Sequence, residues 1–353
     1  MSASRLGFVD VIKGVGSQLI VLHHLAFYGP MAVAVGTVAP GLIAWLNDYA
    51  RIAVQAFLVV GGFLAARGLA PAGRLRVDQP LTLLLRRYLR LALPLMAAVA
   101  LAVLSASLAR QWMVDEAISA PPTAPQLLAH ALLLTDVLGY EALSAGVWYV
   151  AIDLQLFALL LGLLWLAAHL PWRAAQVLVL ALGATSLLFF NRDASWDIWG
   201  VYFFGSYALG VLAWWAARGA CAPLWFWSFA GLALAALAID FRLRIMVALV
   251  VAVVLLWVAA QRRPVEVDTG ASAPPSLQPP RLPIKARVSA FFGRISYSVF
   301  LVHFPICLVI NAAFHRFVGG DAWLNLGGML IAWGASIWAG AQFHRWVESR
   351  ITI

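Results

Sequence analysis

The chain has 353 residues, of which 63% are hydrophobic and only 11% are charged, and its formal net charge is +9. Soluble globular domains are usually about 45–50% apolar and about 25% charged, so this composition excludes an ordinary soluble domain and predicts a polytopic membrane protein. The apolar segments leave no soluble basic domain for nucleic acid. We attribute the positive charge to arginines retained on cytoplasmic loops.

Several apolar segments are long enough to cross a bilayer as helices, which requires about 20 residues. They predict an all-α bundle of about ten transmembrane helices, forming a single domain over residues 1–353. A shorter apolar segment at 126–139 is expected to be re-entrant or interfacial. The predicted spans are residues 7–28, 51–69, 91–109, 147–169, 174–190, 198–217, 222–240, 245–260, 295–317 and 324–346.

The distribution of Lys and Arg predicts the orientation of the bundle. Most of the 24 basic residues fall on one side if both termini are cytoplasmic, and cytoplasmic loops retain Lys and Arg. The segment 264–290 is rich in Pro, Ser, Ala and Gly, and we expect a flexible cytoplasmic loop there because it cannot bury enough apolar surface. Cys221 and Cys307 are isolated in apolar runs and suggest no disulfide or metal site.

The first apolar segment carries ionisable residues that a lipid-facing helix would not tolerate. At about 100° per residue, Lys13 and His24 lie on one helix face together with Asp10 and Ser17, and about 16 Å along the axis separates Lys13 from His24. His23 and His24 are adjacent and point about 100° apart, and the chain has no H-x-x-x-H or H-E-x-x-H motif, so no metal site is expected.

Later segments carry further polar residues. Arg86, Arg87 and Arg90 precede the third span, where guanidinium groups suit either the phosphates of coenzyme A or anionic lipid. Asp153 sits in an apolar helix and needs a cationic partner, either Lys13 or an arginine. Its alternative role is a structural interhelical ion pair.

A second pair of polar residues lies near the C-terminal end of the chain. Ser296 and His303 are seven residues apart and so share a helix face. His303 has either a substrate-orienting or a purely structural role.

Four motifs, in order along the chain, resemble those of the acyltransferase-3 family of membrane proteins, which O-acylate carbohydrates. Lys13 and His24 resemble its Arg/Lys-x10-His pattern, and the arginines at 87 and 90 resemble its R-x-x-R run. Residues 148–157 are similar to its W-S-L-x-x-E-x-Q-F-Y segment, and residues 293–305 to G-x-I-S-Y-x-x-Y-L-x-H-x-P. The chain departs from the pattern with Gly61 and Tyr149 in place of Ser, and with Asp in place of Glu at position 153.

This resemblance implies a multi-pass O-acyltransferase of the bacterial inner membrane. It would move an acyl group, most simply acetyl, from cytoplasmic acetyl-CoA as co-substrate to a hydroxyl of a surface or periplasmic glycan. His24 would act as general base or acyl relay, since imidazole titrates near neutral pH. The implied catalytic residues are His24, Lys13, Asp153 and His303. The implied donor-binding residues are Arg86, Arg87, Arg90 and Lys13, and the implied substrate-binding residues are Ser296, Tyr297, Gln155 and Trp148.

Two other functions compete with this interpretation. A transporter or flippase often has repeated halves with interrupted helices in matching positions, and the sequence shows no such pair. A glycan-polymerising transferase would need a sizeable outer loop, and the longest outer loops are short.

Overall fold

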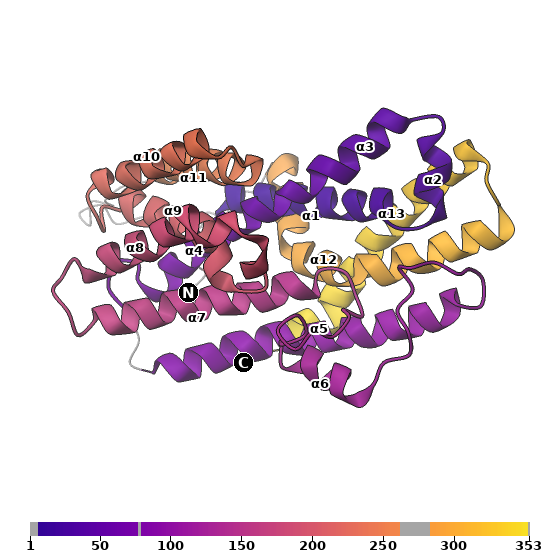
Figure 1. Cartoon of the computed structure of the whole chain (residues 1–353), viewed down its shortest axis with the longest axis horizontal. Helices are drawn as coiled ribbons and strands as arrows, with labels where there is room; N and C mark the ends of the chain where they lie inside the picture. The colour runs from indigo at the N-terminus through magenta and orange to yellow at the C-terminus, as the bar shows by residue number, and fades with distance from the viewer. Residues whose placement is uncertain (1–5, 77–78, 262–282, 352–353) are drawn as a thin grey trace, which may run out of the picture.

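A computed structural model describes residues 6–76, 79–261 and 283–351, and these residues form helices and no strands (Figure 1). The all-α fold expected from composition is therefore confirmed. The helices are α1 (Gly7–Phe27), α2 (Pro30–Gly36), α3 (Pro40–Tyr49), α4 (Ala53–Leu69), α5 (Pro80–Ala109), α6 (Ala124–Ala131), α7 (Val147–Ala167), α8 (Ala174–Leu188), α9 (Gly200–Ala217), α10 (Pro223–Ile239), α11 (Leu243–Gln261), α12 (Ile284–Phe317) and α13 (Ala322–Trp346).

Every predicted span corresponds to a helix, although not all are full-length. Within the described residues, eight helical stretches are long and apolar enough to cross a membrane, and α1 with α2 makes a ninth if this pair, bent by 84°, counts as one span. Helix α10 is apolar but has only 17 residues. The segment 126–139 contains only the eight-residue helix α6 and the turns after it, which is too short to cross a bilayer.

Two helices begin earlier than the sequence indicated. Helix α5 begins at Pro80 rather than at 91, and α12 begins at Ile284 rather than at 295. Residues 284–290, assigned above to the flexible loop, therefore belong to α12, while residues 264–282 lie outside the described residues. Arginine is a good helix former, so a helix can continue past the bilayer where hydropathy alone suggests a boundary.

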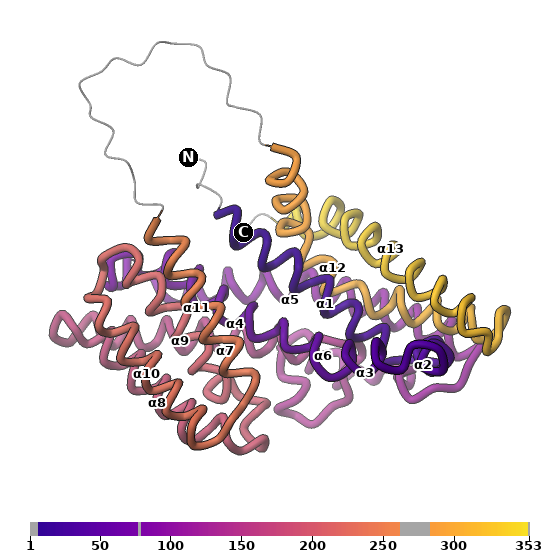
Figure 2. Tube along the Cα trace, turned by 90° about the horizontal axis from the view of Figure 1, so that it is seen from above, coloured from indigo at the N-terminus to yellow at the C-terminus, as the bar shows by residue number. Residues whose placement is uncertain are grey.

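The helices form two groups, which Figure 2 shows at opposite ends of the molecule. Helices α8 to α11 make one group, and α2, α3, α12 and α13 make the other. Contacts of α1 with α4 and α12, and of α5 with α7 and α12, join them. The seam between the two groups therefore runs along α1, α4, α5, α7 and α12.

The first group is built around α9, which is buried along most of its length and packs against α4, α8 and α11. Helices α4 and α9 approach so closely that a side chain at Gly210 would overlap the carbonyl oxygen of Val59, and one at Gly62 would overlap that of Tyr207. Small residues allow such backbone contact between membrane helices. This crossing fixes α4, which lines the site, against the most buried helix.

Candidate active site

A cavity of about 250 Å³ lies in the seam, where α1, α4, α5, α7 and α12 meet. We call it the basic cavity. It brings together polar residues that the sequence singled out on four separate helices. These residues are Lys13, Arg87, Arg90, Asp153, Ser296 and Tyr297.

An ion pair crosses the basic cavity from α5 to α7. Arg87 Nη2 donates to Asp153 Oδ2 at 2.5 Å, and the Asp153 side chain is only 13% exposed. The cationic partner that Asp153 requires is therefore Arg87. The Nε atom of Arg87 is buried and has no hydrogen-bond partner among the described residues, and a buried unpaired donor is costly. An anion entering the cavity would supply the missing acceptor.

The hydroxyl groups of α12 in this cavity are already engaged with the backbone. Tyr297 Oη donates to the carbonyl of Leu91 at 3.0 Å, and Ser296 Oγ donates to that of Gly293 at 3.1 Å. Each oxygen can still accept a hydrogen bond from a ligand. The contact from Tyr297 also ties α12 to α5 beside Arg90.

The basic cavity also contains one acidic residue that sequence reasoning missed. Glu348 follows the last helix, lines the cavity, and accepts hydrogen bonds from Ser298 Oγ at 2.5 Å and His344 Nδ1 at 3.0 Å. In the sequence, Glu348 is only a carboxylate near the end of the chain. Such residues are common at solvated termini and do not indicate a site. Only the tertiary structure shows that it faces Lys13 and the arginines.

His24 and His303 form a hydrogen-bonded pair further along α1 and α12. His24 Nδ1 lies 2.6 Å from His303 Nε2, and the rings are stacked with an interplanar angle of 11°. His303 Nδ1 lies 3.1 Å from the carbonyl oxygen of Val299, which can only accept a hydrogen bond. His303 Nδ1 therefore carries a proton, and in the neutral ring Nε2 accepts. It follows that His24 Nδ1 donates and that His24 Nε2 has a free lone pair.

This chain of hydrogen bonds gives His24 the form that a general base requires. His303 is fully buried, whereas His24 is partly exposed. Because His303 fixes the tautomer, the lone pair of His24 Nε2 is available to a substrate hydroxyl. This arrangement suits His303 to position His24, and the catalytic roles of both residues stay predictions.

Three of the aromatic side chains that line the basic cavity form one group, and one of the three also contacts the histidine pair. We call Phe57, Tyr149 and Phe300 the aromatic layer; all three line the cavity. The Tyr149 ring contacts Phe57 and Phe300 with centroid distances of 6.1 and 5.4 Å, and Phe300 lies 6.1 Å from the ring of His303. The aromatic layer therefore adjoins both the basic cavity and, through Phe300, the histidine pair.

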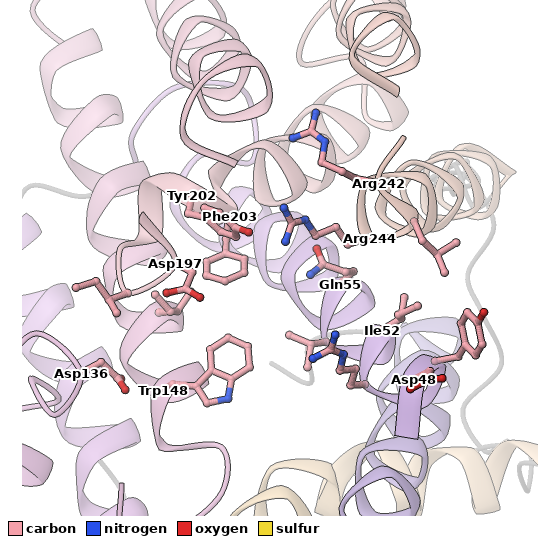
Figure 3. Close-up of a pocket in the computed structure, with 16 residues that line it drawn as sticks. Asp48, Ile52, Gln55, Asp136, Trp148, Asp197, Tyr202, Phe203, Arg242 and Arg244 are labelled. Atoms are coloured by element: carbon pink, nitrogen blue, oxygen red, sulfur yellow. The ribbon is translucent and has the colours of Figure 1, made fainter. Parts of the chain in front are cut away.

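A larger cavity of about 730 Å³ lies next to the basic cavity along α4 and α7, where α4, α7, α9 and α11 begin (Figure 3). We call it the polar cavity. It contains Trp148, which the sequence assigned to substrate binding. Sequence reasoning missed its other polar members, most of which lie in loops or in the first turns of α4 and α11, and which form no motif. The residues that define it here are Gln55, Asp136, Trp148, Asp197, Arg242 and Arg244.

Besides His24 and His303, two predicted site residues lie outside both cavities, namely Arg86 and Gln155. Arg86 is exposed. Gln155 holds the start of α9, since Gly200 N donates to its Oε1 at 2.6 Å and its Nε2 donates to the carbonyl of Ile198 at 3.3 Å. Their roles in binding donor and substrate stay predictions, and the structure gives Gln155 a clear task in capping a helix.

The remaining polar residues of α1 serve packing contacts. Ser17 is buried and donates to the carbonyl of Gly14 at 2.8 Å. His23 Nδ1 lies 3.1 Å from the carbonyl oxygen of Leu46. Asp10 lies where α1 crosses α12 so closely that a side chain at Gly293 would collide with it.

A family model described as an acyltransferase domain matches residues 6–341, which is nearly the whole chain. Comparisons with the curated proteins and with the solved structures gave no match.

Proposed function

The chain belongs to the acyltransferase-3 family and is a membrane acyltransferase, and from that premise we propose that it acetylates a glycan hydroxyl with acetyl-CoA as donor. We propose that it does so in a bacterial inner membrane, with both termini cytoplasmic. The acceptor is then a surface or periplasmic glycan. The single observation that carries the proposal is the hydrogen-bonded pair of His24 and His303 beside a cavity lined with cationic groups.

The donor binds in the basic cavity. Lys13, Arg87 and Arg90 supply the positive charge, and the unpaired Nε of Arg87 awaits an acceptor. Guanidinium groups bind phosphate strongly, often through two parallel hydrogen bonds. The cavity is too small for the whole of coenzyme A, so it holds the phosphates while the thioester arm extends along α1.

The chemical step is acyl transfer assisted by His24. His24 Nε2 takes the proton of the acceptor hydroxyl as its oxygen attacks the thioester carbonyl. The new C–O bond forms, the C–S bond breaks, and the imidazolium of His24 returns the proton to the departing thiolate. His303 stabilises that imidazolium because its Nε2 accepts from His24 Nδ1.

The distance between donor and base leaves two routes for the acyl group. Eleven residues of α1 separate Lys13 from His24, which is about 16 Å along a helix axis. On both routes the donor's flexible arm passes the aromatic layer and brings the thioester to His24. The acyl group then goes either directly to the acceptor oxygen, or first to His24 Nε2, with the coenzyme A thiolate leaving, as a transient acyl-imidazole that the acceptor hydroxyl attacks. A burst of thiol release without acceptor, seen with wild-type protein alone, would identify the second route.

The test of the proposed function compares cells that carry the wild-type chain with cells that carry His24→Ala. We expect acetyl ester on the surface polysaccharide only with the wild-type chain, at equal levels of membrane protein. Acetylation that persists in His24→Ala would refute the proposed role of His24. Glycan uptake into liposomes without any acyl donor, unaffected by His24→Ala, would favour the transporter function instead.

A further inference from the structure

Charged residues of both signs line the polar cavity, Asp48 and Arg51 among them. In Figure 3, Asp136 and Asp197 lie on the same side as Trp148, which we call the acidic wall. Arg242 and Arg244 lie on the other side, which we call the basic wall, and Asp48 lies on that side as well. A binding site for an uncharged, apolar ligand would not require charged side chains on either side. Its volume of about 730 Å³ falls in the range of about 300–1,000 Å³ that is typical of small-molecule sites.

On the basic wall, Arg242 makes more hydrogen bonds to the protein than Arg244 does. Arg242 is 8% exposed, and it donates to Asn191 Oδ1 at 2.8 Å and to the carbonyl of Leu187 at 3.0 Å. Arg244 donates through Nη2 to the carbonyl of Asn191 at 2.7 Å and stacks on Tyr202, with Cζ 4.9 Å from the ring centroid. These two contacts hold the guanidinium of Arg244 in one orientation.

Arg244 also has an unmet hydrogen-bonding need. Its Nε atom is buried and has no hydrogen-bond partner among the described residues. A buried donor without an acceptor costs free energy, and a carboxylate would repay that cost with a charge-assisted bond. Since no acidic side chain accepts from this atom, the missing acceptor is expected to come from a ligand.

The acidic wall is suited to accept hydrogen bonds from hydroxyl groups. Burial, together with the negative charge of Asp197, raises the pKa of Asp136. Carboxylates and carboxyl groups both accept from hydroxyls. Beside them the indole of Trp148 is 36% exposed and packs against Phe203 at a centroid distance of 5.9 Å, which gives an apolar surface for a sugar ring.

We propose that the polar cavity binds the acceptor glycan through a sugar that bears a carboxylate, such as a hexuronate. The carboxylate pairs with Arg244, the ring lies on Trp148, and hydroxyls on the opposite edge donate to Asp136 and Asp197. A doubly charged phosphate would fit less well, because Arg242 is already paired with Asp240 across 3.4 Å and the cavity has acidic groups of its own.

The position of the polar cavity relative to the aromatic layer supports this assignment, which rests on the proposed function. Along α4 the polar cavity ends at Gln55 and the basic cavity begins at Phe57. Along α7 the neighbours Trp148 and Tyr149 line one cavity each. An acceptor bound on Trp148 is thus within one helical turn of the aromatic layer that adjoins His303.

The test measures binding of methyl glucuronide and methyl galacturonide to the full-length purified protein, against methyl glucoside and methyl galactoside, by saturation-transfer NMR without acyl donor. Each pair differs mainly in the carboxylate at C6. We expect the uronides to bind at least tenfold more tightly than the neutral glycosides. We expect Arg244→Gln to abolish this preference and Arg244→Lys to keep part of it.

The matched control is Arg192→Gln, because Arg192 does not line the cavity and its side chain is 52% exposed. Its Nε lies 3.9 Å from Asp240 Oδ2, so this arginine also faces an acidic partner. The Arg192→Gln variant should leave the preference intact. Equal binding of uronide and neutral glycoside, no binding of either, or a preference that survives Arg244→Gln would overturn the proposal. The protein could transfer acetyl groups in a His24-dependent reaction and yet bind uronides no more tightly than neutral glycosides. That result would refute the uronate site and leave the proposed function intact.

Discussion

Replacing His303 with leucine tests how His24 is prepared for catalysis. His303 is fully buried and Leu is of similar bulk and apolar, so His303→Leu should leave the packing of α12 intact. The variant removes the acceptor that lies 2.6 Å from His24 Nδ1. The neutral imidazole of His24 is then free to exchange tautomers, and its protonated form loses its partner.

The size of the effect follows from the charge on His24 in the transition state. A hydrogen bond to a charged group contributes about 1.5–3 kcal/mol. At about 1.36 kcal/mol for each tenfold change in rate, its loss lowers kcat about 10- to 160-fold. The KM for acetyl-CoA should stay within about twofold, since His303 does not line the basic cavity.

The assay is steady-state acetyl transfer by purified protein in proteoliposomes, with kcat and KM for the donor measured separately. His303→Gln is the matched control, because its amide oxygen can still accept from His24 Nδ1. It should retain most of the activity. Both variants must remain folded and monodisperse for the comparison. An unchanged kcat in His303→Leu, or an equal loss of kcat in His303→Leu and His303→Gln, would refute the proposed role of the His303 acceptor.

Further predictions concern the ion pair, the helix crossing and the acidic wall. Arg87→Ala should leave the Asp153 carboxylate buried and unpaired. The double variant Arg87→Ala with Asp153→Ala should therefore melt at a higher temperature than Arg87→Ala alone, and equal melting temperatures would contradict an energetic coupling between the two residues. Gly210→Ala should abolish folded protein, whereas Gly231→Ala, whose added methyl group meets open space, should not. Fluorescence size-exclusion chromatography measures the folded fraction, and equal profiles for the two variants would contradict the close crossing of α4 and α9. Burial raises the pKa of Asp136 in the folded protein, so the carboxyl favours folding at low pH and opposes it as the pH rises through that raised pKa. Asp136→Asn should therefore stabilise the ligand-free protein near neutral pH and lose this advantage in acid, and a pH-independent melting difference would refute the shift.

Periodicity along one helix was enough to place Lys13 and His24 on a common face, and the structure places Lys13 in the basic cavity and His24 beside it. The seven-residue spacing of Ser296 and His303 likewise placed these two residues on one face of α12. A helical repeat describes one helix and not its neighbour. The spacing therefore could not show that the His24 face of α1 meets the His303 face of α12. The contact between His24 and His303, across 279 residues of sequence, was therefore not predicted.

Charge and hydropathy had similar limits. An arginine partner for Asp153 was one of two expected options, and the structure selects Arg87. Asp136 lies in a loop, Arg244 in the first turn of α11 and Glu348 just after α13, and charged residues are usual at such positions and carry no spacing signal. Hydropathy located a helix at every predicted span but began α5 and α12 too late, because both helices start in charged turns that precede the apolar stretch.

The most direct test of the account is the rate of acetyl transfer from labelled acetyl-CoA to glycan by purified protein, compared between the wild type and His24→Gln. Removal of a general base typically lowers the rate by about 10²- to 10⁴-fold. The account predicts a loss of that size with donor affinity unchanged, because His24 does not line the basic cavity. Equal rates in the two proteins would contradict it.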